Sequence, residues 1–165
     1  MNRHVRLGIN IDHVATLRNA RGGDTPKVIE AAKVVEESGA DLITVHVRED
    51  RRHINEKDLG NILDTVNIPV NLEIAANSEM IDIAINYHPK FVCFVPENRK
   101  EITTEGGLDV INNFKELNKV LKSITDTEIN VSIFIDPDKE QIKAVNDLGI
   151  SCLLYTSDAA DDTCC

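Results

Sequence analysis

Strand-like and helix-like segments alternate along most of this 165-residue chain. Short apolar runs rich in Val, Ile and Phe predict strands, and apolar residues at helical spacing predict the helices between them. Such alternation is typical of an α/β fold, in which parallel strands are joined by right-handed helical crossovers. The predicted strands span residues 5–10, 41–47, 69–75, 90–96 and 129–136. The predicted helices span residues 25–40, 55–66, 78–88, 108–124 and 136–148, with Thr25, Asn55, Ser78 and Asp136 at their N-termini and Gly39 ending the first.

Polar residues follow every predicted strand. They are Asn10, Asp12 and His13, then His46 and Arg48, then Glu73, then Pro96 and Glu97, and last Asp136. A dinucleotide-binding sheet needs a glycine-rich turn after its first strand, and "GINIDHVATLRNARGG" contains no GxGxxG. A barrel instead collects the carboxyl ends of its strands at one mouth. We therefore predict a TIM-type (β/α)8 barrel, of which residues 1–151 form about the first five βα units in a single domain.

Residues 152–165, "CLLYTSDAADDTCC", interrupt the alternation. They resemble a translation of the mosaic-end adapter used in sequencing libraries. A disordered acidic tail is the alternative that composition supports. We expect a non-native tail from adapter read-through on a truncated chain, which would be inactive and prone to aggregate because the edges of its sheet are unpaired.

Charge and composition limit the classes of partner. A net charge of −10 opposes general binding to nucleic acid or to a membrane surface. The chain shows no apolar run of membrane-spanning length, no signal-like start and no paired CxxC spacing among its four cysteines. We expect a cytoplasmic protein with a small-molecule substrate. An anionic substrate would suit the positive cluster formed by Arg18, Arg21, Arg48, Arg51 and Arg52.

Ionisable residues are concentrated where the second predicted strand ends. His46 and Arg48 are two residues apart and so share one face, while Val45 and Val47 face the helices. Imidazole suits proton transfer, and guanidinium suits recognition of phosphate or carboxylate. His53 follows in the next loop. The intervening "EDRR" alone is more typical of a solvated charged loop, and the alternatives are electrostatic focusing and salt-bridged scaffolding.

Other candidate groups lie at the ends of neighbouring strands. Glu73 interrupts an apolar strand and is a candidate general base, or else a structural partner for Arg48 or Arg21. Thr103 lies in a polar loop, residues 96–107, that could cover a barrel mouth. None of the five predicted strands ends in lysine, so a protein Schiff base is not indicated.

Five segments, in this order, closely resemble the pyridoxine 5′-phosphate synthase family: "GINIDHVATLRNARGG", "DLITVHVREDRRHI", "VNLEIA", "FVCFVPENRKEITTEGGLDV" and "VSIFID". The resemblance implies condensation of 1-deoxy-D-xylulose 5-phosphate with 3-amino-2-oxopropyl phosphate to pyridoxine 5′-phosphate, phosphate and water. It also implies that the reaction needs no metal and no organic cofactor, and that residues 96–107 form a loop that closes over the site. The full-length protein would be a homo-oligomer, which in the family is an octamer.

Residue roles carried over by motif belong to the resemblance as well. His46 and Glu73 would be the general acid/base groups. Asn10 and Arg21 would bind the amino-ketone phosphate. The sugar phosphate would be bound by Asp12, His13, Arg48, His53 and Thr103. The family's glutamate on strand six and its later catalytic histidine have no counterpart after Ser151.

Two other functions fit the residues without the resemblance. One is a metal-dependent barrel hydrolase that uses Asp12, His13, His46 and His53 as ligands. The other is a non-catalytic module that binds sugar phosphates.

Overall fold

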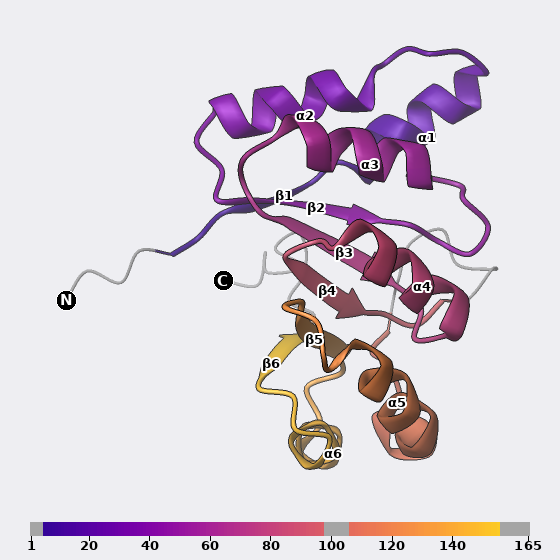
Figure 1. Ribbon diagram of the computed structural model, residues 1–165, viewed down its shortest axis with the longest axis vertical. Coiled ribbons are helices and arrows are strands. Elements are labelled where there is room, and N and C mark those ends of the chain that lie inside the picture. The colour runs from indigo at the N-terminus through magenta and orange to yellow at the C-terminus, as the bar shows by residue number, and fades with distance from the viewer. Residues whose placement is uncertain (1–4, 98–105, 156–165) are drawn as a thin grey trace, which may run out of the picture.

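The computed structural model describes residues 5–97 and 106–155, which form a parallel β-sheet with helices packed along one side (Figure 1). The six strands of this described part lie in chain order, and every neighbouring pair is parallel. The strands are β1 (Gly8–Asn10), β2 (Leu42–His46), β3 (Val70–Ile74), β4 (Phe91–Phe94), β5 (Asn130–Ile135) and β6 (Cys152–Tyr155). The α/β class is therefore confirmed, and the arrangement is that of successive βα units of a (β/α)8 barrel.

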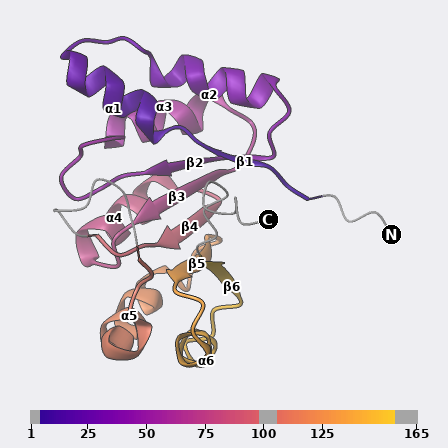
Figure 2. The same ribbon diagram turned by 180° about the vertical axis from the view of Figure 1, so that it is seen from behind.

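Helices lie between the strands along the chain and follow the curve of the sheet, as the view from behind also shows (Figure 2). They are α1 (Asp12–Arg21), α2 (Val28–Glu37), α3 (Glu56–Thr65), α4 (Ser78–Tyr87), α5 (Val110–Ile124) and α6 (Lys139–Asp147). From α2 onward, each helix packs against the next along the chain. None of the helices in the described ranges combines the length and the apolar run needed to cross a bilayer.

The main hydrophobic core lies between the sheet and the helices. Ile43, Val45 and Val47 contribute to it from β2 and the residue after it, and all three are fully buried. Alternate residues of a strand point to opposite faces, so His46 points away from this core. The strand register places it in one row with Glu73, Cys93 and Ser132 on the opposite face. In a closed barrel this face becomes the interior.

Three local features differ from the sequence-based expectation. Helix α1 was not predicted, and only Asp12 and Ala15 of its residues are buried, so its apolar pattern is weak. The N-caps at Thr25, Ser78 and Asp136 are wrong. The residues at the cap positions are Lys27, Asn77 and Asp138. Asn77 and Ser78, like Asp136 and Asp138, cap almost equally well, so propensity alone does not choose between them. Lys27 forms no side-chain cap, so α2 begins without the cap that Thr25 was expected to provide.

Strand β6 also lies where we predicted no regular structure. Its backbone pairs in parallel with β5, from Ser132 opposite Cys152 to Ile135 opposite Tyr155. The segment "CLLY" has high β propensity and meets the otherwise unpaired edge of β5, which accounts for the pairing. The adapter origin of residues 152–165 stays a prediction, and residues 156–165 lie outside the described part.

Candidate active site

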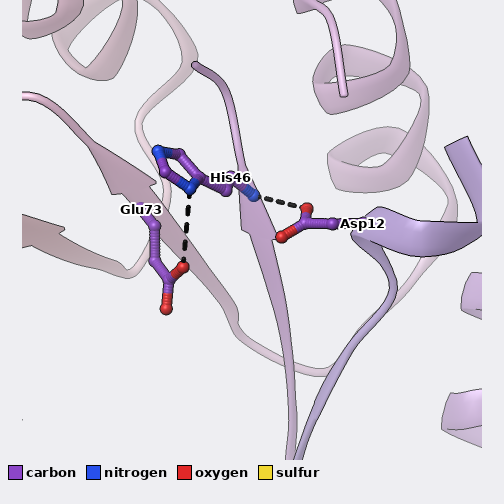
Figure 3. Close-up of side chains that lie close together, drawn as sticks. All are labelled: Asp12, His46 and Glu73. Carbon is purple, nitrogen blue, oxygen red and sulfur yellow. Dashed lines mark hydrogen bonds and ion pairs between the residues drawn. The ribbon is translucent and has the colours of Figure 1, made fainter. Parts of the chain in front are cut away.

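His46 is the centre of a group of three carboxylates at the carboxyl end of the sheet. It is the last residue of β2 and is 4% exposed. Its backbone N–H donates a 2.7 Å hydrogen bond to Oδ1 of Asp12, and its Nδ1 lies 3.9 Å from Oε2 of Glu73 (Figure 3). Its Nε2 lies 3.0 Å from Oε1 of Glu97. A carboxylate thus lies beside each of the two ring nitrogens.

Asp12 links the end of β1 to the end of β2. It is the first residue of α1, and the Nδ2 of Asn10 donates to its Oδ2 over 2.8 Å. In return, the backbone N–H of Asp12 donates to Oδ1 of Asn10 over 2.9 Å. Burial raises the pKa of Asp12, although the hydrogen bonds from His46 and Asn10 oppose that shift. Asn10 and Asp12 therefore lie together at the carboxyl end of β1.

Glu73 lies on β3 directly opposite His46 in the parallel register. Its side chain is 18% exposed, and burial raises its pKa to about 7. The neighbouring His46 opposes this rise, and Asp12 adds to it. A carboxyl group with a pKa near neutrality can both donate and accept a proton in the same reaction cycle. The His46 and Glu73 pair is thus chemically suited to general acid/base catalysis.

Glu97 was not among the predicted site residues. Its two oxygens accept from different segments: Oε1 faces His46 Nε2, and Oε2 accepts a 3.0 Å hydrogen bond from the backbone N–H of Glu49. Burial would raise the pKa of Glu97, but these hydrogen bonds outweigh it and the pKa is lowered. Its position just after β4 was visible in the sequence as a polar strand end. The contact between its side chain and His46 could not be predicted from the sequence.

His53 forms a second group beside the first. It is 6% exposed, and its Nδ1 lies 2.7 Å from Oγ1 of Thr16. Burial, followed by the positive charge of nearby residues, lowers its pKa to about 4, so His53 is neutral near pH 7. The exposed ring of His13 approaches it edge-on, with 5.8 Å between ring centroids. His53 and His13 are thus adjacent, although Thr16 was not predicted.

The remaining predicted residues are Arg48, Arg21 and Thr103. Arg48 is 2% exposed, with its Nε 4.0 Å from Oδ1 of Asp50. Arg21 is the exposed last residue of α1, and within residues 5–97 and 106–155 no hydrogen bond or ion pair joins it to His46 or Glu73. Thr103 lies outside the described residues.

The predicted cluster of free positive charge is not what the structure contains. Arg18 forms two hydrogen bonds with Asp58, of 2.6 and 2.9 Å. Arg51 pairs with Glu56 and Glu79, and Arg52 pairs with Asp50. Carboxylates from α3, α4 and their own loop thus offset the charge of Arg51 and Arg52, which favours the interpretation of "EDRR" as salt-bridged scaffolding.

The structure also tests how the candidate metal ligands are arranged. Single ligand atoms of Asp12, His46 and Glu73 lie within 4.8 Å of one another. His13 and His53, which the hydrolase hypothesis required, do not join this group in the described part of the chain. Both oxygens of Asp12 already accept hydrogen bonds. The group thus offers two carboxylates and one imidazole, and it lacks the further histidines that the hydrolase hypothesis required.

This chain is similar to known proteins in both sequence and fold, and the similarity in sequence is the more specific of the two. The pyridoxine 5′-phosphate synthase of Rhodospirillum rubrum is 50% identical over 149 residues, which cover 90% of this chain and 60% of that protein. The pyridoxine 5′-phosphate synthase of Aquifex pyrophilus is 52% identical over 145 residues, covering 88% and 61%. The chain thus spans about 60% of the length of these curated relatives.

Solved structures show the same architecture at low sequence identity. A crystal structure of mandelate oxidase with (S)-2-phenylpropionate superimposes with a TM-score of 0.60 at 12% identity, covering 91% of this chain and 55% of the oxidase. That likeness concerns the fold alone. Residues 7–163 match the profile of the family described as pyridoxal phosphate biosynthesis protein PdxJ, and the chain belongs to this family.

Proposed function

We propose that this chain supplies the first part of a pyridoxine 5′-phosphate synthase active site. The observation that carries the proposal is the pairing of His46 with Glu73 across β2 and β3, with the Glu73 carboxyl tuned to a pKa of about 7. Closing a pyridine ring from two open-chain substrates requires repeated proton transfer to and from carbon and oxygen. A buried acid/base pair without a covalent nucleophile suits that demand.

The proposed substrates are 1-deoxy-D-xylulose 5-phosphate and 3-amino-2-oxopropyl phosphate. The buried Arg48 guanidinium is a candidate for the sugar phosphate, because arginine binds phosphate through two parallel hydrogen bonds. The neutral His53 would hydrogen-bond the same substrate rather than attract its charge. The roles assigned to Asn10, Asp12, His13, Arg21 and Thr103 by resemblance are part of this proposal.

Three further properties belong to the proposal through the family. The complete protein would act in the cytoplasm, assemble as a homo-oligomer, and need neither metal nor organic cofactor. The strand-six glutamate and the later histidine of the family would complete the site.

The test is a chimera of residues 1–151 with the remaining C-terminal part of the Rhodospirillum rubrum relative, assayed for pyridoxine 5′-phosphate formation from the two substrates. We expect product, and we expect Glu73→Gln to reduce the rate by about 10²- to 10⁴-fold because it removes the acid/base group. Glu79→Gln, at an exposed position on α4, is the matched control and should keep the rate.

The same assay separates the alternatives. A folded chimera without product, beside an active Rhodospirillum rubrum protein, would contradict the proposal. Substrate binding that is equal in the chimera and its Glu73→Gln variant, without turnover in either, would favour the binding module. A folded chimera that forms no product and retains zinc after purification would favour the metal-dependent hydrolase.

A further inference from the structure

We propose that Glu97 is a positioning residue that holds the His46 imidazole as the Nε2–H tautomer, so that Nδ1 is the atom that exchanges a proton at the site. The inference rests on the proposed function only for the catalytic role of His46. The position of the proton on the ring can be measured without substrate.

The two carboxylates beside His46 approach opposite sides of the ring at different distances. Oε1 of Glu97 lies 3.0 Å from Nε2, which is a normal hydrogen-bond length. Oε2 of Glu73 lies 3.9 Å from Nδ1, which is too long for one. Glu97 therefore makes the stronger contact with the ring.

A neutral Glu97 could donate to Nε2 at this contact, whereas an ionised Glu97 can only accept. Its second oxygen, Oε2, already accepts the backbone N–H of Glu49, and its side chain is 7% exposed. The hydrogen bonds that it accepts lower its pKa, which supports the ionised form near pH 7. Because an ionised carboxylate has no proton to donate, Nε2 must carry the hydrogen of the bond. The neutral ring then has a lone pair at Nδ1.

The lone pair at Nδ1 is directed toward Glu73, the group whose pKa lies near neutrality. The 3.9 Å separation places these two atoms so that a substrate atom or a water beside them can contact both. Proton exchange would then run between Nδ1 and Glu73 through that atom, and Nε2 would keep its hydrogen throughout. Glu97 also ties the ring to the backbone at Glu49, which fixes the orientation of the ring.

The experiment measures the His46 tautomer in the uniformly ¹⁵N-labelled 165-residue chain, with the pH raised until the ring signals of His46 no longer change. Two-bond ¹H–¹⁵N correlations report which ring nitrogen carries hydrogen, and a His46→Gln variant identifies the His46 signals. We expect Nε2–H to predominate. Each carboxylate favours hydrogen on the ring nitrogen that it faces. Glu97→Gln removes the carboxylate at Nε2 and leaves that of Glu73 at Nδ1, so we expect the ratio of Nε2–H to Nδ1–H to fall by about tenfold.

Two further variants make the result specific. Glu73→Gln removes the competing carboxylate and should keep or increase the preference for Nε2–H. Glu79→Gln removes one exposed negative charge from α4 and should leave the ratio unchanged. The proposal is overturned if Nδ1–H predominates in the unsubstituted chain, or if Glu97→Gln changes the ratio no more than Glu79→Gln does.

If Glu97→Gln fails to fold, Glu97→Asp takes its place, because the shorter side chain withdraws the carboxylate from Nε2 and keeps its charge; an unchanged ratio in that variant overturns the proposal. The positioning proposal and the synthase proposal can also fail independently of each other. An Nε2–H ring in this chain together with an inactive chimera would leave the positioning role intact and contradict the synthase proposal. An Nδ1–H ring in this chain together with an active chimera would contradict the positioning role and leave the synthase proposal intact.

Discussion

The carboxylate of Asp12 accepts the backbone N–H of His46 over 2.7 Å, and both residues are buried. This bond joins the start of α1 to the end of β2, 34 residues further along the chain. It extends the pairing of β1 with β2, which runs from Gly8 to Asn10. The site residue His46 is thus fixed through its main chain as well as through its ring.

Asp12→Ala removes the acceptor for a buried N–H group. We expect the free energy of unfolding to fall by about 1–3 kcal/mol, because the N–H of His46 would be left without a partner or would need a water. Urea denaturation followed by circular dichroism measures the change. Asp64→Ala, at an exposed position of α3, is the control and should stay within about 0.5 kcal/mol. Equal effects of the two variants would contradict the structural role of Asp12.

Glu73 makes stability depend on pH in a predictable direction. Its pKa in the folded chain, about 7, lies above the ordinary value of 4.5, so its contribution to stability is present below about pH 4.5 and is lost as the pH rises through 7. A shift of this size corresponds to about 3 kcal/mol at most. Glu73→Gln should therefore be more stable than the unsubstituted chain at pH 8, with the difference shrinking toward pH 5.

Urea denaturation at a series of pH values tests this, with Glu79→Gln as the control for loss of one exposed carboxylate. A difference between Glu73→Gln and the unsubstituted chain that stays constant from pH 5 to pH 8 would show that Glu73 titrates normally.

His53 makes stability depend on pH in the direction opposite to that of Glu73. Its pKa falls from the ordinary 6.5 to about 4 in the folded chain, so its contribution is present above about pH 6.5 and is lost as the pH falls through 4. The stability advantage of the unsubstituted chain over His53→Asn should therefore shrink between about pH 6.5 and pH 4. His88→Asn is the control, because His88 is exposed and asparagine tolerates its φ of 49°. A loss of equal size in both variants would refute the prediction.

The Arg18–Asp58 pair should couple α1 to α3. Its side chains are 14% and 12% exposed, and Asp58 also accepts the backbone N–H of Asn55 in the capping box of α3. A double-mutant cycle with Arg18→Met and Asp58→Asn should give a coupling energy of about 1–2 kcal/mol, since the contact is bidentate and largely buried. The same cycle on Lys27 and Glu30, an exposed pair 3.3 Å apart, should give less than about 0.5 kcal/mol. Similar coupling energies for the two pairs would show that burial does not strengthen the contact between Arg18 and Asp58.

Gly107 is needed because the backbone of β5 passes too close for a side chain. A Cβ atom at this position would clash with the backbone nitrogen of Asp136, whereas at Gly106 nothing lies within 4 Å. The N–H of Gly107 also donates to Oδ1 of Asp136 over 2.9 Å. Gly107→Ala should cost about 2 kcal/mol or more, and Gly106→Ala less than about 1 kcal/mol, in thermal or urea unfolding. Two alanine variants of equal stability would be inconsistent with this close approach.

Much of the fold could be predicted because its strands are dense apolar runs. The predicted strands at 41–47 and 69–75 each contain an observed strand, and Asn55 caps α3 through a local capping box with Asp58. Helix α1 was missed because few of its residues face the core. Strand β6 was missed because its sequence was read as a tail.

The site was predictable where strand geometry alone determines proximity. His46 and Glu73 end neighbouring parallel strands, so their register brings them together. Glu97 follows β4 in a loop, and its contact with His46 depends on the path of that loop, which no periodic pattern encodes. The pairing of Arg18 with Asp58 spans 40 residues and depends on helix packing in the same way.

The order of the strands has a consequence for how such a chain assembles. Since each strand adds beside the one that precedes it in sequence, no strand must be inserted between two that are already paired. The sheet can therefore grow outward by one βα unit at a time, much as repeat proteins extend from a stable nucleus. In such a sheet the inner strands β3 and β4 open last, and the carboxylates and imidazole they help to hold are protected by neighbours on both flanks.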